Sequence, residues 1–249
     1  MTDMIKQFAE LHIPGEPIIL YNIWDAGSAQ VAVRSGAKAV ATGSLSVAGA
    51  QGFEDGEKLP FEFALTNAKH IVAAVDVPVS IDLETGYGAD AATVGVNAQQ
   101  MKDAGAAGLN LEDQDLSAGG LLDVSAQAER VKAAADTGLF INARTDLFIQ
   151  TPLPDHDDTL AQKALERCSA YADAGAGSFF IPFAMDEKLI SNICEKASLP
   201  VNIMMMPDGP SMSRLAELGV SRISFGPGPW KAAMAAFEAE ALKILTDQA

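Results

Sequence analysis

Short apolar runs alternate with amphipathic helical segments along the whole chain, and this alternation limits the possible folds more than any other feature. Eight runs rich in Val, Ile, Leu or Phe are typical of buried parallel strands, and they cover residues 18–22, 39–44, 77–84, 108–113, 139–146, 177–183, 199–207 and 222–226. Helical periodicity covers residues 27–35, 60–75, 89–104, 125–137, 159–174, 187–197, 211–218 and 230–247. Repeated strand–helix units predict a parallel sheet covered by helices.

Four of the predicted helices end at a glycine shortly before the next strand, namely Gly36, Gly105, Gly175 and Gly219. Glycine takes the left-handed conformation that ends a helix at no steric cost, so these junctions indicate repeated β/α units. We predict a (β/α)₈ TIM barrel formed by a single domain over residues 1–249, with a last helix at about 230–247. The alternative is an open doubly wound sheet, but no Gly-x-Gly-x-x-Gly motif follows the first strand.

The charge balance restricts the partners that the chain is expected to bind. The sequence has 33 acidic and 17 basic residues, giving a net charge of −16. Such a surface repels phosphate backbones and anionic lipids, so we expect neither a nucleic acid nor a membrane as partner. The two cysteines, Cys168 and Cys194, fall in helical segments, and the N-terminus lacks a signal-peptide pattern. These features predict a cytoplasmic protein.

Acidic side chains end the third and fourth predicted strands, at the barrel face where active sites lie. Asp82 and Glu84 are two residues apart and share one side of an extended strand, and Glu112 ends the next strand. Any one of them alone is typical of a solvated residue or a helix cap. Three together repel one another unless a cation compensates them, and a ligand set of oxygens favours Mg²⁺ or Mn²⁺ over Zn²⁺. We therefore predict a divalent-metal site.

Other polar and small residues follow the strands at the same end. Arg144 closes the fifth strand and would give an anionic substrate a local positive potential in this acidic protein. The small-residue stretch after the second strand could bring backbone N–H groups close to an anion, or could simply be a tight turn. The candidate substrate-binding residues are Thr42, Gly43, Ser44, Leu45, Asn110, Asn142, Arg144 and Asn202.

At these residues the chain resembles the isocitrate lyase/phosphoenolpyruvate mutase superfamily. The motif Asp82-Leu-Glu-Thr-Gly-Tyr-Gly is similar to the family's Asp-x-Asp-x-Gly-Tyr-Gly, with Glu84 in place of the second aspartate. Residues 108–114 match the strand that ends in the family's Glu-Asp pair, and residues 142–146 match the strand whose arginine binds the substrate carboxylate. Residues 42–45 and 52–55 align with the substrate loop and with a metal-side aspartate, here Asp55.

The resemblance implies a Mg²⁺ enzyme that makes or breaks a C–C or P–C bond beside a pyruvate-like unit. It implies that Asp55, Asp82, Glu84 and Glu112 hold the ion directly or through its waters. It also implies that Arg144, with the backbone N–H groups of residues 43–45, binds the substrate carboxylate and 2-oxo oxygen. Members often form dimers or tetramers by exchanging the last helix, so a homo-oligomer is expected.

The loop at residues 113–123 departs from the two main branches of this family. Isocitrate and methylisocitrate lyases carry Lys-Lys-Cys-Gly-His there, and phosphoenolpyruvate mutases carry a Lys-Thr-Asn-type group; this chain has neither. The leading hypothesis is a Mg²⁺-dependent carbon–carbon lyase or decarboxylase that acts on a small 2-oxo or 2-hydroxy mono- or dicarboxylate through an enolate. The alternatives are mutase or phosphonopyruvate hydrolase chemistry at a P–C bond, and a barrel that binds a dicarboxylate without turnover. The candidate catalytic residues are Arg144, Glu112, Asp113 and Tyr21. The enolate must later gain a proton, and Tyr21, Asp113, Ser44 or a metal-bound water could supply it.

Overall fold

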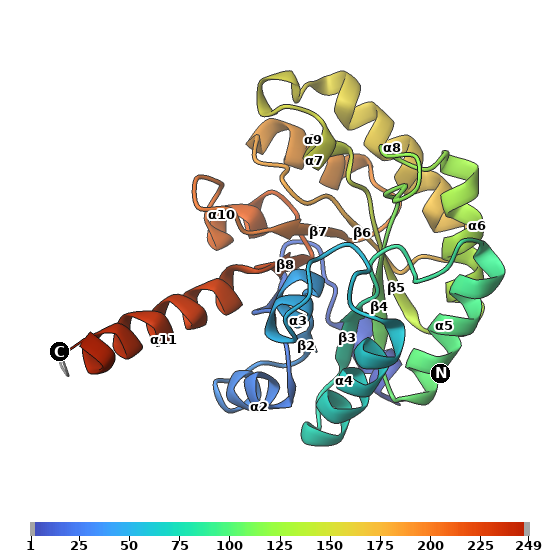
Figure 1. The fold of residues 1–249 in the computed structure, drawn as a ribbon. Coiled ribbons are helices and arrows are strands. Elements are labelled where there is room, and N and C mark those ends of the chain that lie inside the picture. Colours follow the sequence, from blue (N-terminus) through green and yellow to red (C-terminus); the bar gives the residue numbers. More distant parts are fainter. Residues whose placement is uncertain (1–2, 247–249) are drawn as a thin grey trace.

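The computed structural model describes residues 3–246 and forms the predicted TIM barrel (Figure 1). Within these residues, eight parallel strands pair in the order β1-β8-β7-β6-β5-β4-β3-β2. Ile23, just beyond β1, bridges Thr42, just beyond β2, and this contact brings the two ends of the sheet together. The strands are β1 (Ile18–Leu20), β2 (Val40–Ala41), β3 (Val79–Asp82), β4 (Gly108–Glu112), β5 (Phe140–Arg144), β6 (Ser178–Phe180), β7 (Val201–Met204) and β8 (Arg222–Ser224).

Helices surround the strands on the outside, as the repeated units predicted (Figure 1). The predicted helices are α2 (Ala26–Arg34), α4 (Phe61–Ala74), α5 (Ala91–Asp103), α6 (Val124–Ala135), α8 (Asp158–Asp173), α9 (Glu187–Lys196), α10 (Met212–Glu217) and α11 (Gly228–Thr246). Four short elements were not predicted: α1 (Asp3–Glu10), α3 (Ser44–Ala50), α7 (Leu147–Gln150) and the 3₁₀ turn η1 (Leu153–Asp155). Residues 1–2 and 247–249 of the predicted domain, and the predicted end of the last helix at 247, lie outside the described residues.

The glycine junctions behave as predicted from the sequence. Gly36, Gly105, Gly175 and Gly219 have φ of 99, 96, 95 and 89°. A side chain at these positions would be strained, so glycine is what allows each helix to turn back toward the sheet. At the opposite ends, several helices begin at a side chain that accepts a hydrogen bond from the first turn, and these caps are Asp25, Asp90, Asp157, Asp186 and Ser211.

The N-terminal helix α1 closes the barrel at the end away from the strand carboxyl termini. Phe8 is fully buried, and its ring lies 5.3 Å from the ring of Phe140 in an edge-on arrangement. A Cβ on Gly108 would come within 2.9 Å of the Phe8 ring. The absence of a side chain at Gly108 therefore leaves room for the Phe8 ring to pack against the end of the barrel. Only the carboxyl-terminal mouth of the barrel is left for a site.

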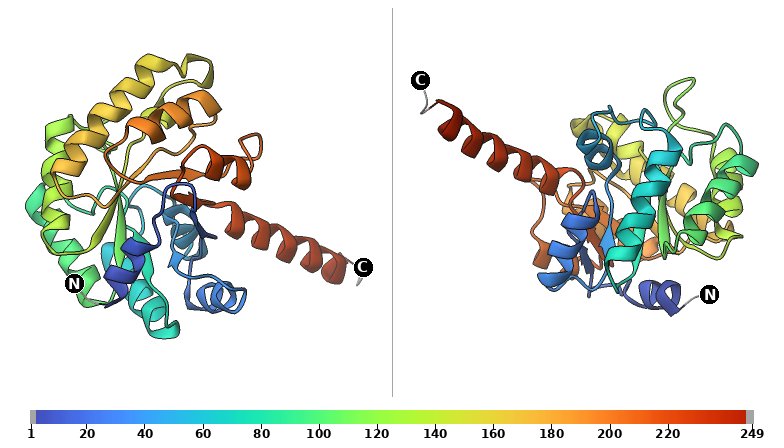
Figure 2. Two further views of the ribbon diagram at one scale, coloured as in Figure 1. Left: turned by 180° about the vertical axis from the view of Figure 1, so that it is seen from behind. Right: turned by 60° about the horizontal axis from the view of Figure 1, so that its bottom comes forward.

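The last helix departs from the regular barrel, because α11 projects away from it (Figures 1 and 2). Its root is fixed where the Trp230 ring packs on Gly49, whose Cβ would come within 2.7 Å of the ring. Beyond the root it exposes apolar side chains; Phe237 is 73% exposed. The outer face of β1 is left bare, and a groove of about 1010 Å³ runs between β1, α2 and the root of α11. Among residues 3–246, no helix combines the length and apolar character needed to cross a bilayer.

Candidate active site

The carboxyl ends of β3, β4 and β5 bring the predicted charged side chains together. Glu112 and Arg144 are register neighbours on β4 and β5 and form an ion pair. Arg144 also makes a two-point contact with Asp146, with Nε–Oδ1 at 2.6 Å and Nη2–Oδ2 at 2.9 Å. Asp82 lies close enough to Glu112, Arg144 and Asp146 to shift the pKa of each. Together, these residues form the charged rim of the barrel mouth.

Asp82 is held in place by the turn that follows β2. Its backbone N–H donates to Thr42 Oγ1 at 2.8 Å, and its Oδ2 accepts from the backbone N–H of Ser44 at 2.9 Å. Its Oδ1 is buried and has no hydrogen-bond partner among the residues that the structure describes. A cavity of about 10 Å³, close to the room that one water or ion needs, borders Asp82, Glu84 and Thr42. A buried, unsatisfied carboxylate oxygen is costly unless a cation or water meets it.

Glu84 reaches the site in a way that the sequence argument did not foresee. The strand ends at Asp82, and Glu84 lies in the following turn with φ of 52°, so the two side chains do not share a strand face. Glu84 accepts from the Tyr87 hydroxyl at 2.8 Å and from the Glu57 backbone N–H at 2.5 Å. Glu57 and Tyr87 also have positive φ, of 58 and 53°. Such strained backbone clusters at functional sites and persists only where its surroundings hold it.

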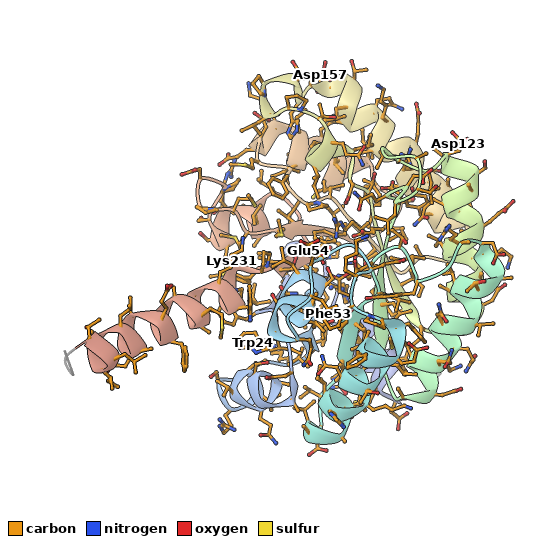
Figure 3. The ribbon with its side chains drawn as sticks, in the orientation of Figure 1. Trp24, Phe53, Glu54, Asp123, Asp157 and Lys231 are labelled. Carbon is orange, nitrogen blue, oxygen red and sulfur yellow. The ribbon has the colours of Figure 1, made fainter. Side chains whose placement is uncertain are left out.

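Glu57 is a residue of this site that the sequence analysis missed. Its carboxylate accepts from the Thr85 hydroxyl at 2.5 Å and from the Tyr87 backbone N–H at 2.8 Å. It thereby pins the turn that carries Glu84. The only available signal was its position two residues after Asp55 on the same loop. Figure 3 labels Phe53 and Glu54 of that loop near the centre of the view, over the barrel.

Burial and mutual repulsion raise the pKa of the site carboxyls. Burial raises the pKa of Glu84 to about 7, and Asp82 and Asp55 add to this. Burial also raises the pKa of Glu112 and of Asp146, and Arg144 offsets only part of the effect. The pKa of Asp55 rises by partial burial and by repulsion from Asp82, although its solvent contact screens these effects.

The charges at the mouth do not balance. Burial opposes the charge on Arg144, but Glu112, Asp146 and Asp82 outweigh it and raise the pKa of the guanidinium, which therefore stays protonated. One guanidinium thus faces five carboxyl groups, which are Asp55, Asp82, Glu84, Glu112 and Asp146. A divalent cation would supply the missing positive charge.

The donor set fits a metal ion that keeps part of its water shell. Within residues 3–246, no three carboxylates are arranged to chelate a single ion directly. Asp82 Oδ1 is the one buried carboxylate oxygen of the described residues that lacks a partner, so it is the natural direct ligand. The other carboxylates would then contact the ion through its waters. Mg²⁺ suits this arrangement because it dehydrates reluctantly and is commonly held by one or two carboxylates.

The turn at residues 42–45 is the start of a helix rather than the end of a strand. Thr42 is buried with its hydroxyl bonded to β3, and Gly43 precedes the first turn of α3. The N–H of Ser44 already donates to Asp82, so this backbone orients the carboxylate in the structure as it stands. Leu45 follows on the same turn, partly buried. The predicted contact of Gly43–Leu45 N–H groups with a substrate stays a prediction.

The three asparagines predicted to bind substrate hydrogen-bond to one another inside the barrel. Asn142 Nδ2 donates to Asn110 Oδ1 at 2.8 Å and to Asn202 Oδ1 at 3.0 Å. Asn142 and Asn202 are fully buried, and Asn110 Oδ1 also accepts from the buried Arg222 at 3.0 Å. Their polar groups are used in this layer below the mouth. The contact of these asparagines with a substrate stays a prediction.

Asp113 and Tyr21 also lie away from the reacting position predicted for them. Asp113 is fully buried, and its Oδ2 accepts from Arg167 and Tyr171, each at 2.9 Å. Its Oδ1 accepts from the backbone N–H of Asp146 at 2.9 Å, so it positions the partner of Arg144 instead of transferring a proton. Tyr21 lies on the outer face of the wall, in the groove beside α2, with its ring 5.2 Å from that of Phe225. These placements do not favour Asp113 or Tyr21 as the proton donor, and their catalytic roles stay predictions.

Comparison with known proteins now identifies the family. The family model described as phosphoenolpyruvate phosphomutase matches residues 8–245. The chain belongs to the phosphoenolpyruvate mutase/isocitrate lyase superfamily. This superfamily contains lyases and mutases, so its membership supports an enzymatic role and confirms both the resemblance and the fold predicted from the sequence.

Relatives of the superfamily match nearly the whole chain. A crystal structure from Burkholderia cenocepacia, provisionally described as a phosphonomutase, is 42% identical with a TM-score of 0.94, and the match covers 97% of this chain and 98% of that one. An uncharacterised protein of Mycobacterium tuberculosis is 32% identical, covering 96% of this chain and 89% of its own. The phosphoenolpyruvate phosphomutase of Streptomyces hygroscopicus is 29% identical, covering 96% and 79%.

The raised pKa of Glu84 predicts a pH-dependent stability in the metal-free protein. Between the ordinary value of 4.5 and about 7, the folded state binds a proton that the unfolded state has released. Stability should therefore fall as the pH rises through this window. Thermal melts in EDTA between pH 5 and 8 should show this decline, and the variant Glu84→Gln should reduce its slope. An unchanged slope in the variant would mean that Glu84 does not carry the shift.

Asp113 is predicted to stabilise the folded protein through its buried contacts with Arg167 and Tyr171. Replacing Asp113 by Ala leaves the Arg167 guanidinium buried without its carboxylate, which should cost about 3–5 kcal/mol in urea unfolding. The matched control is Asp136→Ala, which breaks an exposed ion pair with Lys132 on α6 and should cost only about 0.3–0.5 kcal/mol. Equal losses for both variants would show that the buried network around Asp113 contributes nothing.

Proposed function

We propose that this protein is a cytoplasmic, Mg²⁺-dependent enzyme that cleaves a carbon–carbon bond beside the carboxylate of a small 2-oxo or 2-hydroxy acid. The observation that carries the proposal is the unpartnered Oδ1 of Asp82, buried beside four other carboxyl groups and one guanidinium. A divalent ion held there would act as a Lewis acid on the 2-oxo or 2-hydroxy oxygen as negative charge develops on it.

Arg144 has the free donors needed for a substrate carboxylate. Its Nε and one N–H on each terminal nitrogen are used by Glu112 and Asp146. A guanidinium has five N–H donors, so one N–H is left on each terminal nitrogen. These two donors, on the two terminal nitrogens, are available to the oxygens of a carboxylate. The acidic partners on either side keep the guanidinium charged and fix its orientation.

Glu112 is the residue that we assign to proton transfer. It is buried at the mouth, in direct contact with Arg144, and burial raises its pKa. A carboxyl group at this place, beside the guanidinium that would hold the substrate, could carry a proton to and from a carbanionic carbon. Of the other candidates, Asp113 and Tyr21 lie outside the mouth, whereas Ser44 lies beside Asp82.

Phosphorus–carbon chemistry is the second candidate, because two relatives carry the names phosphonomutase and phosphoenolpyruvate phosphomutase. A phosphoryl group carries two negative charges, and its transfer is usually helped by cationic side chains. The loops after β4, β6, β7 and β8, at residues 113–123, 181–186, 205–211 and 225–227, contain no Lys, Arg or His. The other loops at this end carry Lys58 before α4 and His156 after β5, and the His156 ring is held by the backbone carbonyls of Phe148 and Thr151. We therefore favour carbon–carbon cleavage.

Oxalate tests this proposal, because it is a planar mimic of the enolate of a 2-oxo acid. Calorimetry with Mg²⁺ should show saturable binding that vanishes in EDTA. Asp82→Asn should abolish the Mg²⁺ dependence, and Arg144→Ala should weaken binding by about 1.5–3 kcal/mol, the range for a charged hydrogen bond. The exposed Asp136→Asn variant, at the residue that follows α6, serves as control. Equal oxalate affinity in Mg²⁺ and in EDTA would contradict the metal-dependent site.

We also propose that the chain forms a homo-oligomer, a dimer or tetramer, in which α11 of one copy covers the bare β1 face of another. Ile19 and Tyr21 on that face are 40 and 53% exposed, and Phe237 and Leu245 on α11 are each 73% exposed. Figure 3 labels Trp24 on the groove wall and Lys231 at the root of α11 on the same side of the barrel. Covering both apolar surfaces at once would remove them from water.

Light scattering after gel filtration tests this assembly. Phe237→Asp should convert the oligomer to a monomer. It places a charge among the exposed apolar side chains of α11 and changes no residue of the barrel itself. Glu238→Lys, on the neighbouring position of the same helix, is the control and should leave the mass unchanged. A monomeric parent protein, or an unchanged mass for Phe237→Asp, would contradict the exchange of α11.

A further inference from the structure

The strand register shows which side chains share the height of the metal-binding carboxylate. In a TIM barrel, alternate strands contribute to one interior layer. Following the parallel pairing around the barrel, β1, β3, β5 and β7 place Asn22, Asp82, Arg144 and Met204 in one layer. Since β7 is four strands away from β3 in a barrel of eight, Met204 faces Asp82 across the mouth.

Independent contacts place the Met204 side chain inside the wall. Asn202, two residues earlier on β7, donates to Ser224 Oγ inside the barrel at 3.2 Å, and side chains two apart on a strand point the same way. The Met204 thioether covers Gly226, where a Cβ would come within 2.6 Å of Sδ. Met204 is only partly buried, so it keeps surface for a ligand.

The neighbouring strand β6 continues this apolar side of the mouth. Phe180 ends β6 as the register neighbour of Arg144, and Pro182 follows two residues later; both are buried. Phe183, at the rim, is 38% exposed and has φ of 63°. A bulky residue in this conformation is strained, and such strain marks functional segments. The β6–β8 side of the mouth is therefore built from Phe, Pro, Met and Gly, opposite the carboxylates on β3 and β4.

The distribution of charged residues also differs between the β6–β8 side of the mouth and the side formed by β3 to β5. The four loops that follow β4, β6, β7 and β8 carry no basic residue, as described above. Arg144 would already be engaged by the first carboxylate of a substrate. A second anionic group would meet apolar side chains on one side and five carboxyl groups on the other, and neither would replace its lost hydration.

We infer that the substrate carries a single carboxylate, and that the fragment cleaved from its 2-oxo acid head is an uncharged, apolar aldehyde or ketone, as in a 4-hydroxy-2-oxo acid with an alkyl or aryl substituent at C4. The C3–C4 electron pair would pass into the enolate of the 2-oxo acid, the C4 hydroxyl would lose its proton to become the carbonyl of the leaving fragment, and a proton would return to C3. Met204 and Phe183 determine this specificity by contacting the apolar substituent. The inference rests on the proposed function, because Arg144 and the metal site fix which end of the substrate lies on the β3–β5 side. It goes further by naming the class of substituent on the other side.

A matched pair of ligands tests the inference in Mg²⁺ buffer. 4-Methyl-2-oxopentanoate and oxaloacetate have the same 2-oxo acid head and differ in a branched apolar end against a planar carboxylate of similar shape. Competition against oxalate, with freshly dissolved oxaloacetate, should show the apolar ligand binding at least tenfold more tightly. Along the series pyruvate, 2-oxobutanoate and 2-oxopentanoate, each buried methylene should improve affinity by roughly fourfold.

A substitution at Met204 gives the second readout. Met204→Lys places a cation in the apolar side and should reverse the preference, so that oxaloacetate and phosphonopyruvate compete better than 4-methyl-2-oxopentanoate. Phe183→Ala, at the exposed rim, should reduce the preference for the apolar ligand even if Met204→Lys fails to fold. Met212→Lys, at an exposed position on α10, is the control and should leave the affinity ratio as in the parent.

The possible results separate this inference from the proposed function. Mg²⁺-dependent oxalate binding with a preference for the apolar ligand supports both. Mg²⁺-dependent oxalate binding in which oxaloacetate or phosphonopyruvate competes as well as 4-methyl-2-oxopentanoate overturns the inference and leaves the proposed function standing. Oxalate binding that does not depend on Mg²⁺, or that is absent, overturns both.

Discussion

The site depends on an unbalanced cluster of charges that the barrel holds together. Five carboxyl groups stand around Arg144, and most of them are buried, so their mutual repulsion is poorly screened. The fold resists this repulsion with rigid supports. Thr42 and Ser44 fix Asp82, Glu57 pins the turn that carries Glu84, and the network around Asp113 holds the backbone of Asp146. A divalent cation needs such preorganised carboxylates, and the cation together with Arg144 would then stabilise an anionic transition state.

The parts of this site that follow regular rules could be predicted from the sequence. The parallel strands bring their carboxyl ends to one face, so Asp82, Glu112 and Arg144 could be placed together from hydrophobic periodicity alone, and the glycine junctions marked the helix ends. The sequence could not predict side-chain positions that depend on contacts between residues distant in the chain. Glu84 was assigned to a strand face, yet the backbone turns at φ of 52° because Glu57, distant in sequence, holds it there. Asp113 follows a site glutamate, but Arg167 and Tyr171 of α8 draw its side chain away from the mouth.

The two sides of the mouth have different chemistry, and the barrel assigns them to different strands. β3 to β5 supply the carboxylates and the guanidinium, whereas β6 to β8 supply apolar side chains. The layer of hydrogen-bonded asparagines lies below both sides, inside the barrel. The outer wall at β1 is incomplete because α11 projects away (Figure 2). The surface that we propose for assembly is therefore separate from the mouth that we propose for chemistry. Tyr21 lies on the proposed assembly surface, although it directly follows β1.

The central claim is that a divalent ion binds at the unpartnered oxygen of Asp82. A crystal structure of the protein grown with Mn²⁺ and oxalate tests it most directly, because the anomalous scattering of manganese locates the ion independently of the refined atoms. The account predicts one anomalous peak within bonding distance of Asp82 Oδ1, at about 2.0–2.2 Å, with oxalate between the ion and Arg144. A peak elsewhere, or none at saturating Mn²⁺ with the Arg144 ion pairs intact, would contradict it.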